Sequence, residues 1–102
     1  MKVKMPFKKR FKEPMLNGTK TFTSRTKRMG KIGDTFEAFG RTFIIKDIWV
    51  ATLRGVSAFW EEEGCESKED FMEIWKQIHP RKGWQPEQEV YVHIFKSVGG
   101  EG

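Results

Sequence analysis

The sequence predicts one small α+β domain, in which a mixed sheet or barrel packs against helices at one side. Its 102 residues fit a single hydrophobic core and leave no room for a second. Hydrophobic residues make up 37% of the chain and include nine Phe and four Trp, so we expect a well-packed core. Extended patterns dominate the first half and return at the end, with helical patterns between them.

Two short elements are predicted near the N-terminus. Val3–Phe7 alternates apolar and basic residues, which favours a first strand. Phe11–Asn17 is typical of a short helix. Because proline is tolerated only in the first helical turn, Pro14 places most of this helix over residues 13–17, and Gly18 ends it.

The next segments predict a β-hairpin. An extended segment, Thr21–Ser24, comes first, and the polar, basic stretch Thr26–Lys31 is typical of a loop. Thr35–Phe39 and Thr42–Leu53 are both rich in residues that favour strands, and a glycine turn separates them. We therefore expect these two strands to pair as a hairpin.

Helical signals follow the hairpin. Val56–Glu63 is predicted to form a short helix that ends before Gly64, and Ser67 has the spacing of an N-cap for the next helix. Pro80 ends that second helix. Its apolar residues fall at i, i+3, i+4 and i+7 and so form one stripe that faces the core: Phe71, Ile74, Trp75 and Ile78.

The last strand is predicted to be central. Glu89–Lys96 carries apolar residues on both faces, which is typical of a strand with neighbours on each side. The glycine-rich end is too short to fold alone. We expect a single domain over residues 1–102, with its core at about residues 3–96 and a flexible tail at residues 97–102.

The residues and motifs that the sequence lacks exclude several classes of protein. No apolar run approaches the ~20 uncharged residues of a membrane helix, and the basic N-terminus lacks the apolar stretch of a secretory signal, so we expect a cytoplasmic protein. Cys65 is the only cysteine, which rules out an internal disulfide and a thiolate metal site. His79 and His93 have no second ligand at a metal spacing, and no glycine loop has a phosphate-binding spacing. We therefore expect no metal and no cofactor.

Positive charge is concentrated in the first third of the chain. Residues 1–31 hold eleven Lys or Arg and one acid, for a net charge of +10, whereas residues 32–102 have a net charge of −5. A basic face of this kind can follow a polyanion such as RNA, with an affinity that falls as salt rises. Solvated lysines explain the same pattern, so the charge alone leaves both interpretations open.

The segment Gly18–Arg25 is a candidate site. It places a helix end, two cations and four hydroxyls within eight residues. Hydroxyls and cations together suit a bound anion or carbonyl group. A polar strand edge with solvated charges is the alternative interpretation.

This segment also resembles the opening of a known family. The run Gly18-x-Lys20-Thr21-x-Thr23-x-Arg25 is similar to the signature of ASCH domains, small relatives of the RNA-binding PUA fold. The resemblance covers most of residues 7–96. Its other parts are Phe7 to Phe11, Gly33-Asp34, Glu63-Gly64 before a helix bearing Phe71 and Trp75, Ile78-His79-Pro80, and the final strand Val90 to Phe95.

The resemblance implies a fold and a site. The fold would be a PUA-like mixed β-barrel of about five or six strands, with two or three helices packed at one side. A cleft between barrel and helices would bind RNA or a nucleoside-like ligand. One branch of small ASCH proteins hydrolyses the acetyl amide of N4-acetylcytidine. By that resemblance Lys20 would be the base, Thr23 the nucleophile and Glu63 the acid.

Such chemistry makes physical demands on these residues. Lys20 must be neutral to accept the Thr23 proton, so its pKa must lie well below ~10.4, lowered by burial or by Arg25. Glu63, as the acid, would need a poorly solvated pocket, yet its attraction to Lys20 would favour both charged forms. Residues three apart on a regular strand face opposite sides, so we expect Lys20 in the turn before the strand.

Two compatible functions therefore follow: binding of RNA or a nucleoside, and amide hydrolysis. Binding is placed first, because an enzyme for free nucleosides would not need a long basic stripe. The proposed phosphate contacts are Arg25, Lys27, Arg28 and Lys31, with a solubilising loop as the alternative. The loop Arg81–Gln88 looks longer than in the acetylcytidine branch and carries Trp84, which could stack on a base or pack over the end of the barrel.

Overall fold

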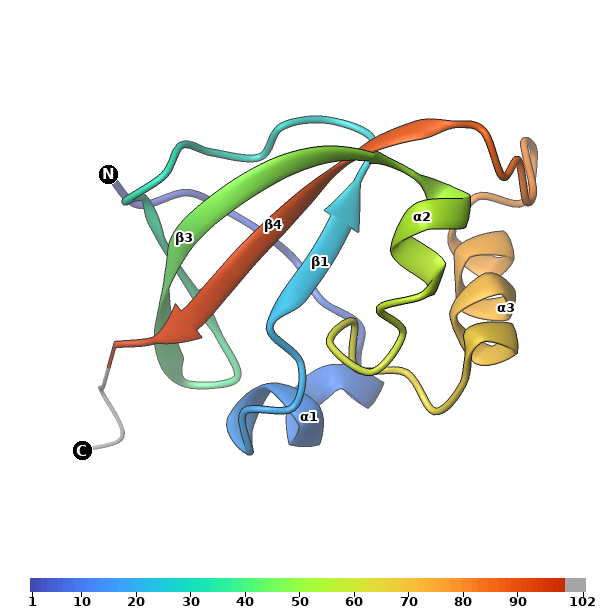
Figure 1. Ribbon diagram of the computed structural model, residues 1–102. Helices are drawn as coiled ribbons and strands as arrows, with labels where there is room; N and C mark the ends of the chain where they lie inside the picture. The colour runs from blue at the N-terminus through green and yellow to red at the C-terminus, as the bar shows by residue number, and fades with distance from the viewer. Residues whose placement is uncertain (99–102) are drawn as a thin grey trace.

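Four antiparallel strands form the centre of the fold. The computed structural model describes residues 1–98, and the strands curl into a half-barrel in the order β1–β4–β3–β2 (Figure 1). The predicted hairpin forms between β2 and β3, and the last strand is central because it pairs with both β1 and β3. The strands are β1 (Phe22–Arg25), β2 (Thr35–Ala38), β3 (Arg41–Thr52) and β4 (Glu89–Ser97).

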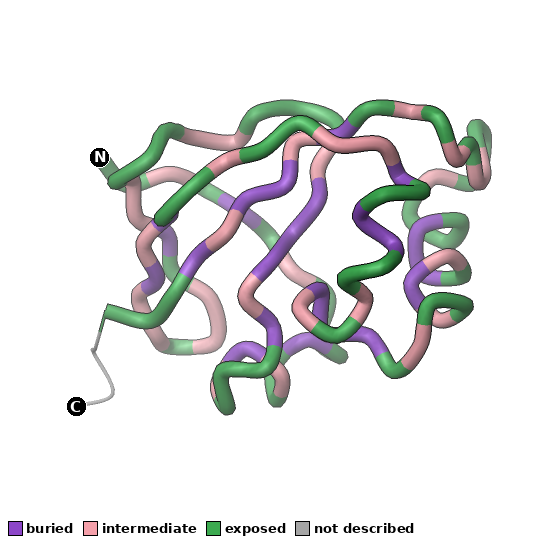
Figure 2. The backbone as a smooth tube through the Cα atoms, viewed as in Figure 1, coloured by how far each residue is buried: buried purple, intermediate pink, exposed green. Residues whose placement is uncertain are grey.

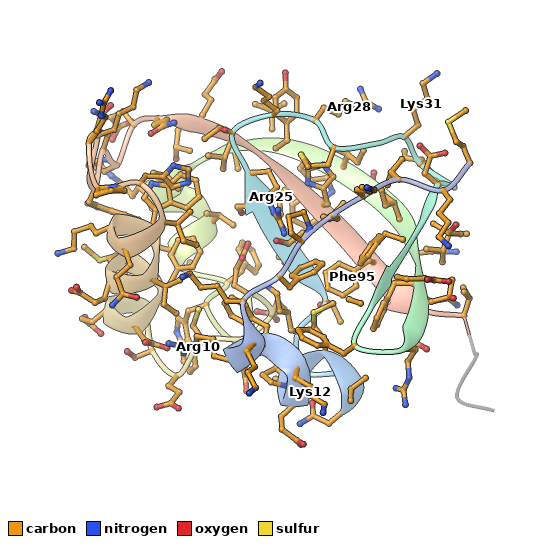
Figure 3. The ribbon with its side chains drawn as sticks, turned by 180° about the vertical axis from the view of Figure 1, so that it is seen from behind. Arg10, Lys12, Arg25, Arg28, Lys31 and Phe95 are labelled. Carbon is orange, nitrogen blue, oxygen red and sulfur yellow. The ribbon has the colours of Figure 1, made fainter. Side chains whose placement is uncertain are left out.

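A barrel of five or six strands is not confirmed within the described residues. The strand expected at Val3–Phe7 does not form. The β-pairing near it is a single isolated parallel bridge between Lys2 and Thr35. Pro6 has no N–H with which to continue such a ladder. The segment instead crosses one face of the sheet as an extended chain, as Figure 3 shows. The sheet is therefore antiparallel apart from this one bridge.

Two of the predicted helices are confirmed. The first is α1, which follows a single 3-10 turn, η1, and contains Pro14 in its first turn. The second is α3, where the Ser67 hydroxyl accepts the Asp70 N–H at 3.0 Å and so caps the helix as predicted. The bounds are η1 (Lys9–Phe11), α1 (Lys12–Leu16) and α3 (Lys68–Ile78).

The helix between β3 and α3 lies earlier in the chain than predicted. Instead of residues 56–63, the helix α2 covers Leu53–Ser57, and turns follow it. The helix begins early because Thr52, the last residue of a strand-like sequence, acts as its N-cap. The Thr52 hydroxyl accepts the Gly55 N–H at 3.0 Å, which starts the helix directly at the end of β3.

The core is aromatic and lies between the sheet and the N-terminal segment. Phe36, Phe43 and Phe95 are each buried, and their ring centroids lie 5.4–5.5 Å apart. Phe7 stacks on Phe36 at 5.6 Å. Figure 2 shows buried residues along β1 and β4 and on the inner side of α3. This packing holds the N-terminal segment across the sheet, where it forms one wall of the candidate site.

The ends of the chain add little to the core. Ser97 is the last residue of β4, so the tail predicted for residues 97–102 begins inside a strand. Residues 99–102 of that prediction lie outside the described residues. Within residues 1–98, no helix has the length and apolar character needed to cross a membrane.

Candidate functional site

A cavity of about 710 Å³ lies between the N-terminal segment and α3, with β1 at its base. Its volume falls in the range of small-molecule sites, ~300–1,000 Å³. The helix contributes the apolar stripe that the sequence predicts, together with rings from the N-terminal segment. The rest of the lining is mostly polar, and its buried polar side chains include all three residues of the predicted chemistry: Lys20, Thr23 and Glu63.

Lys20 lies in the connection between α1 and β1, as predicted. Gly18, with a φ of +86°, turns the chain at the end of α1, and the Lys20 N–H donates to the Pro14 carbonyl at 2.9 Å. Lys20 is 3% exposed. Its Nζ donates to two backbone carbonyl oxygens, that of Phe22 at 2.7 Å and that of Glu63 at 2.6 Å.

Burial lowers the pKa of Lys20 to about 8. The Glu63 carboxylate, with Oε1 3.7 Å from Nζ, acts in the opposite direction because it stabilises the ammonium form. The nearby Arg25 adds to the lowering. The sequence left open whether desolvation or the attraction of Glu63 would have the larger effect on the Lys20 pKa. Desolvation has the larger effect, and a fraction of Lys20 is neutral near pH 8.

Glu63 is held at both carboxylate oxygens. The backbone beside it is fixed because the Phe22 N–H donates to the Glu62 carbonyl at 2.9 Å. The Ser24 hydroxyl donates to Glu63 Oε2 at 2.7 Å, while Oε1 faces Lys20. Ser24 was missed as a site residue. The signal was its hydroxyl within the polar run before Arg25, but the strand pattern did not show that it meets a carboxylate.

Thr23 is oriented by Arg25. The Arg25 Nε donates to Thr23 Oγ1 at 3.1 Å, and Nη2 donates to the Pro6 carbonyl at 2.6 Å. The guanidinium carbon also lies 4.9 Å from the centroid of the Phe7 ring. Arg25 thus ties the end of β1 to the N-terminal segment (Figure 3). Within residues 1–98 the Thr23 hydroxyl proton has no acceptor, so it is available to a ligand or a base.

His93 is a buried structural residue rather than a free base. The Met29 N–H donates to His93 Nε2 at 3.0 Å, so the ring proton must sit on Nδ1, which faces the Thr23 carbonyl at 3.3 Å. Burial lowers the pKa of His93, which is consistent with this neutral form. The ring therefore links the loop that follows β1 to β4 underneath the site.

Gly64 packs directly against the stem of Lys20. A Cβ at Gly64 would lie 2.9 Å from Lys20 Cβ and Cδ, and the glycine has a φ of +84°. We expect Gly64→Ala to destabilise the protein by at least about 2 kcal/mol, since a left-handed alanine costs ~1–2 kcal/mol before any clash. Urea unfolding measures the loss.

The matched control for this substitution is Gly40→Ala. Gly40 has a φ of +78°, but nothing lies within 4 Å of its Cβ direction, so only the conformational cost remains. Equal losses in the two variants would contradict a role for Gly64 in seating Lys20.

The predicted phosphate contacts divide into two pairs. Arg25 and Lys27 line the cavity, whereas Arg28 and Lys31 do not. The Arg28 Nε donates to the Gly30 carbonyl at 3.2 Å, and Figure 3 places both Arg28 and Lys31 away from Arg25, along the loop between β1 and β2.

Trp84 lies outside the lining of the cavity. It packs edge-on against Phe71, with centroids 6.0 Å apart and planes at 90°, and it is partly buried against the core. This placement matches the packing alternative, and base stacking by Trp84 stays a prediction.

Trp75 combines a core position with a place in the cavity wall. Its Nε1 is buried and has no hydrogen-bond partner among the described residues, which is unusual for an indole N–H. The ring of His79, also in the lining, lies 4.2 Å from the Trp75 ring. The helical stripe predicts that Trp75 lies in the core. The periodicity of the stripe cannot show that the indole N–H lacks a hydrogen-bond acceptor.

Cys65 completes the inner lining. Burial raises the pKa of its thiol to about 12, so it is a poor nucleophile at neutral pH. In residues 1–98 no group of three or more His, Cys, Asp or Glu side chains is arranged to hold a metal ion.

Comparisons with known proteins support the fold. No family model matches the sequence, and no curated protein matches it significantly. The solved structure of the hypothetical protein PH0355 is similar at a TM-score of 0.75, with 19% identity over 96% of this chain and 100% of that one. Protein PF0455 from Pyrococcus furiosus gives a TM-score of 0.65, with 19% identity over 96% of this chain and 98% of that one.

A third solved structure identifies the fold. The ASCH domain from Lactobacillus crispatus JV V101 superposes with a TM-score of 0.67 and 13% identity, and the match covers 95% of this chain and 79% of that one. The chain therefore has the fold of an ASCH domain, the PUA-like architecture that its motifs predict.

Proposed function

We propose that the cavity binds a nucleoside-like ligand. The observation that carries this proposal is the composition of the cavity lining, in which aromatic and aliphatic side chains meet buried hydrogen-bonding groups. A planar heterocycle would pack against the apolar residues of α3, while the Thr23 and Ser24 hydroxyls offer hydrogen bonds to its polar edge.

A second candidate function, amide hydrolysis, is favoured by the hydrogen bonds of Lys20. Its Nζ has two short bonds to backbone carbonyls, and these use two N–H groups. The third tetrahedral position holds an N–H in the ammonium form and a lone pair in the amine form. With a pKa of about 8, Lys20 can therefore act as a base without losing its two carbonyl partners.

The chemistry on an acylated cytosine would proceed in two stages. Lys20 takes the proton of the Thr23 hydroxyl as Thr23 Oγ1 attacks the acyl carbon. The tetrahedral intermediate then collapses, the C–N bond breaks, and the leaving amine takes up a proton from the Lys20–Glu63 pair. Water hydrolyses the resulting ester of Thr23 and releases the acid. Arg25, which already donates to Thr23 Oγ1, would help to stabilise the developing negative charge.

The test combines binding and turnover in Thr23→Val, which removes the hydroxyl but keeps its shape. We expect the native protein to bind cytidine in calorimetry and to release cytidine from N4-acetylcytidine. The variant should keep cytidine binding within a few-fold but lose turnover by at least about a hundredfold.

Each outcome of this test has a distinct meaning. Absence of cytidine binding by the folded native protein would overturn the nucleoside proposal. Binding without turnover would remove the hydrolase and leave the binding function. Unchanged turnover in Thr23→Val would show that Thr23 is not the nucleophile.

A further inference from the structure

The charges that line the cavity do not balance. Four basic side chains and one carboxylate belong to the lining: Lys8, Lys20, Arg25, Lys27 and Glu63. Lys20 and Glu63 face each other at 3.7 Å and compensate one another. Arg25, Lys8 and Lys27 have no carboxylate within ion-pair distance among the described residues, so three cations remain uncompensated around one cavity.

These three cations come together because of one side chain. Arg25 donates to the Pro6 carbonyl at 2.6 Å and lies over the Phe7 ring, which fixes the N-terminal segment beside the end of β1. Lys8 directly follows that segment, and Lys27 lies two residues beyond β1. Both lysines are exposed while they line the cavity, so they occupy its rim rather than its interior.

Arg25 itself is preorganised to bind an oxyanion. Its Nε and one N–H of Nη2 have protein acceptors, and the other N–H groups of the guanidinium have none among residues 1–98. The two contacts fix the plane of the group before a ligand arrives, which reduces the entropy cost of binding. A cationic rim next to an apolar, hydrogen-bonding interior fits a ligand whose charged group lies at one end.

We infer that the ligand of this cavity is a nucleoside phosphate monoester, with Lys8, Arg25 and Lys27 binding the phosphate. The inference rests on the proposed nucleoside site and names its substrate class. A single phosphate is favoured over a nucleic acid strand because Lys8, Arg25 and Lys27 meet at one cavity, whereas the next cations along the chain do not line it. Beyond the rim, the Arg28 Nε donates to the Gly30 carbonyl, and the Lys31 backbone N–H donates to Asp34 at 2.8 Å while its side chain is exposed outside the cavity.

The experiment compares two double variants with the same change in charge. Lys8→Gln/Lys27→Gln neutralises the rim, whereas Arg28→Gln/Lys31→Gln neutralises two exposed cations outside the cavity. Calorimetry measures the binding of cytidine, of cytidine monophosphate, and of a short oligocytidylate without terminal phosphates. Arg25 is left intact because it also positions Thr23.

The native protein should bind the monophosphate at least about tenfold more tightly than cytidine, which corresponds to about 1.4 kcal/mol. The rim variant should reduce this preference to about twofold or less, while the control variant keeps it and both bind cytidine as the native protein does. Added salt should weaken monophosphate binding and leave cytidine binding nearly unchanged.

Three results would overturn the inference in different ways. Equal affinities of the native protein for cytidine and its monophosphate would remove the phosphate site and leave the nucleoside proposal intact. Absence of binding to either compound would remove both. Tightest binding of the oligonucleotide, lost in Arg28→Gln/Lys31→Gln, would show instead that the surface follows an RNA strand.

Discussion

Lys20→Met is expected to destabilise the protein by about 3 kcal/mol at pH 7, because it leaves a buried carboxylate without its counter-charge. Glu63 is 4% exposed and would keep Ser24 as its remaining side-chain partner. The carbonyls of Phe22 and Glu63 would also lose the donor that now lies at 2.7 and 2.6 Å. Urea unfolding with far-UV circular dichroism measures the loss.

The double variant Lys20→Met/Glu63→Leu separates the two contributions. Removing the carboxylate relieves the uncompensated charge but not the two carbonyls, so we expect about half of the lost stability to return. A loss of less than about 1 kcal/mol in Lys20→Met would contradict the buried ion pair. Since Lys20 supports the fold as well as the proposed chemistry, loss of turnover in a Lys20 variant is weaker support for catalysis than loss in Thr23→Val.

The position of Lys20 could be predicted from the sequence because it depends on local rules. The period of two in a strand separates Lys20 from Thr23, and Gly18 supplies the turn that brings both to one cavity. The helical stripe of α3 and the Ser67 cap are local in the same sense. Each of these depends on residues within a few positions of one another.

The features that the sequence did not show depend on contacts between distant segments. The N-terminal segment lies across the sheet because Arg25 and the Phe36 ring hold it there, and neither contact has a local signal. The same is true of Ser24, which meets a carboxylate 39 residues away. Thr52 was missed for another reason, since a β-branched residue at the end of a strand pattern hides its role as a helix cap.

The second large effect is a dependence of stability on pH that belongs to Lys20. The folded pKa is about 8 and the ordinary value is 10.5. Between these values the unfolded chain keeps a proton that the folded chain has lost, so the free energy of unfolding rises with pH. The full rise is about 3 kcal/mol, at ~1.4 kcal/mol for each pKa unit, and it is complete only above pH 10.5.

Cys65 acts in the opposite direction over part of this range. Its pKa is raised from 9.0 to about 12, so the unfolded thiol ionises first and stability falls as pH rises above 9. Most of this contribution comes from burial of the thiol and is shared by the native protein and Lys20→Met, although the Lys20 charge also acts on Cys65; the Lys20 contribution is absent from the variant. The difference in unfolding free energy between the two proteins should therefore grow steadily from pH 7 to pH 10, and a constant difference would contradict the lowered pKa.

The same ionisation connects stability to the proposed chemistry. If the neutral amine of Lys20 is the base, hydrolysis of N4-acetylcytidine should rise with pH with a midpoint near pH 8, which is where the rise in stability begins. His93 cannot produce that profile, because its ring is buried with both nitrogens facing backbone partners and its pKa is lowered. A turnover midpoint near pH 6 would therefore point away from Lys20, whereas a turnover midpoint near pH 8, together with a rise in stability that begins there, would assign both effects to one buried lysine.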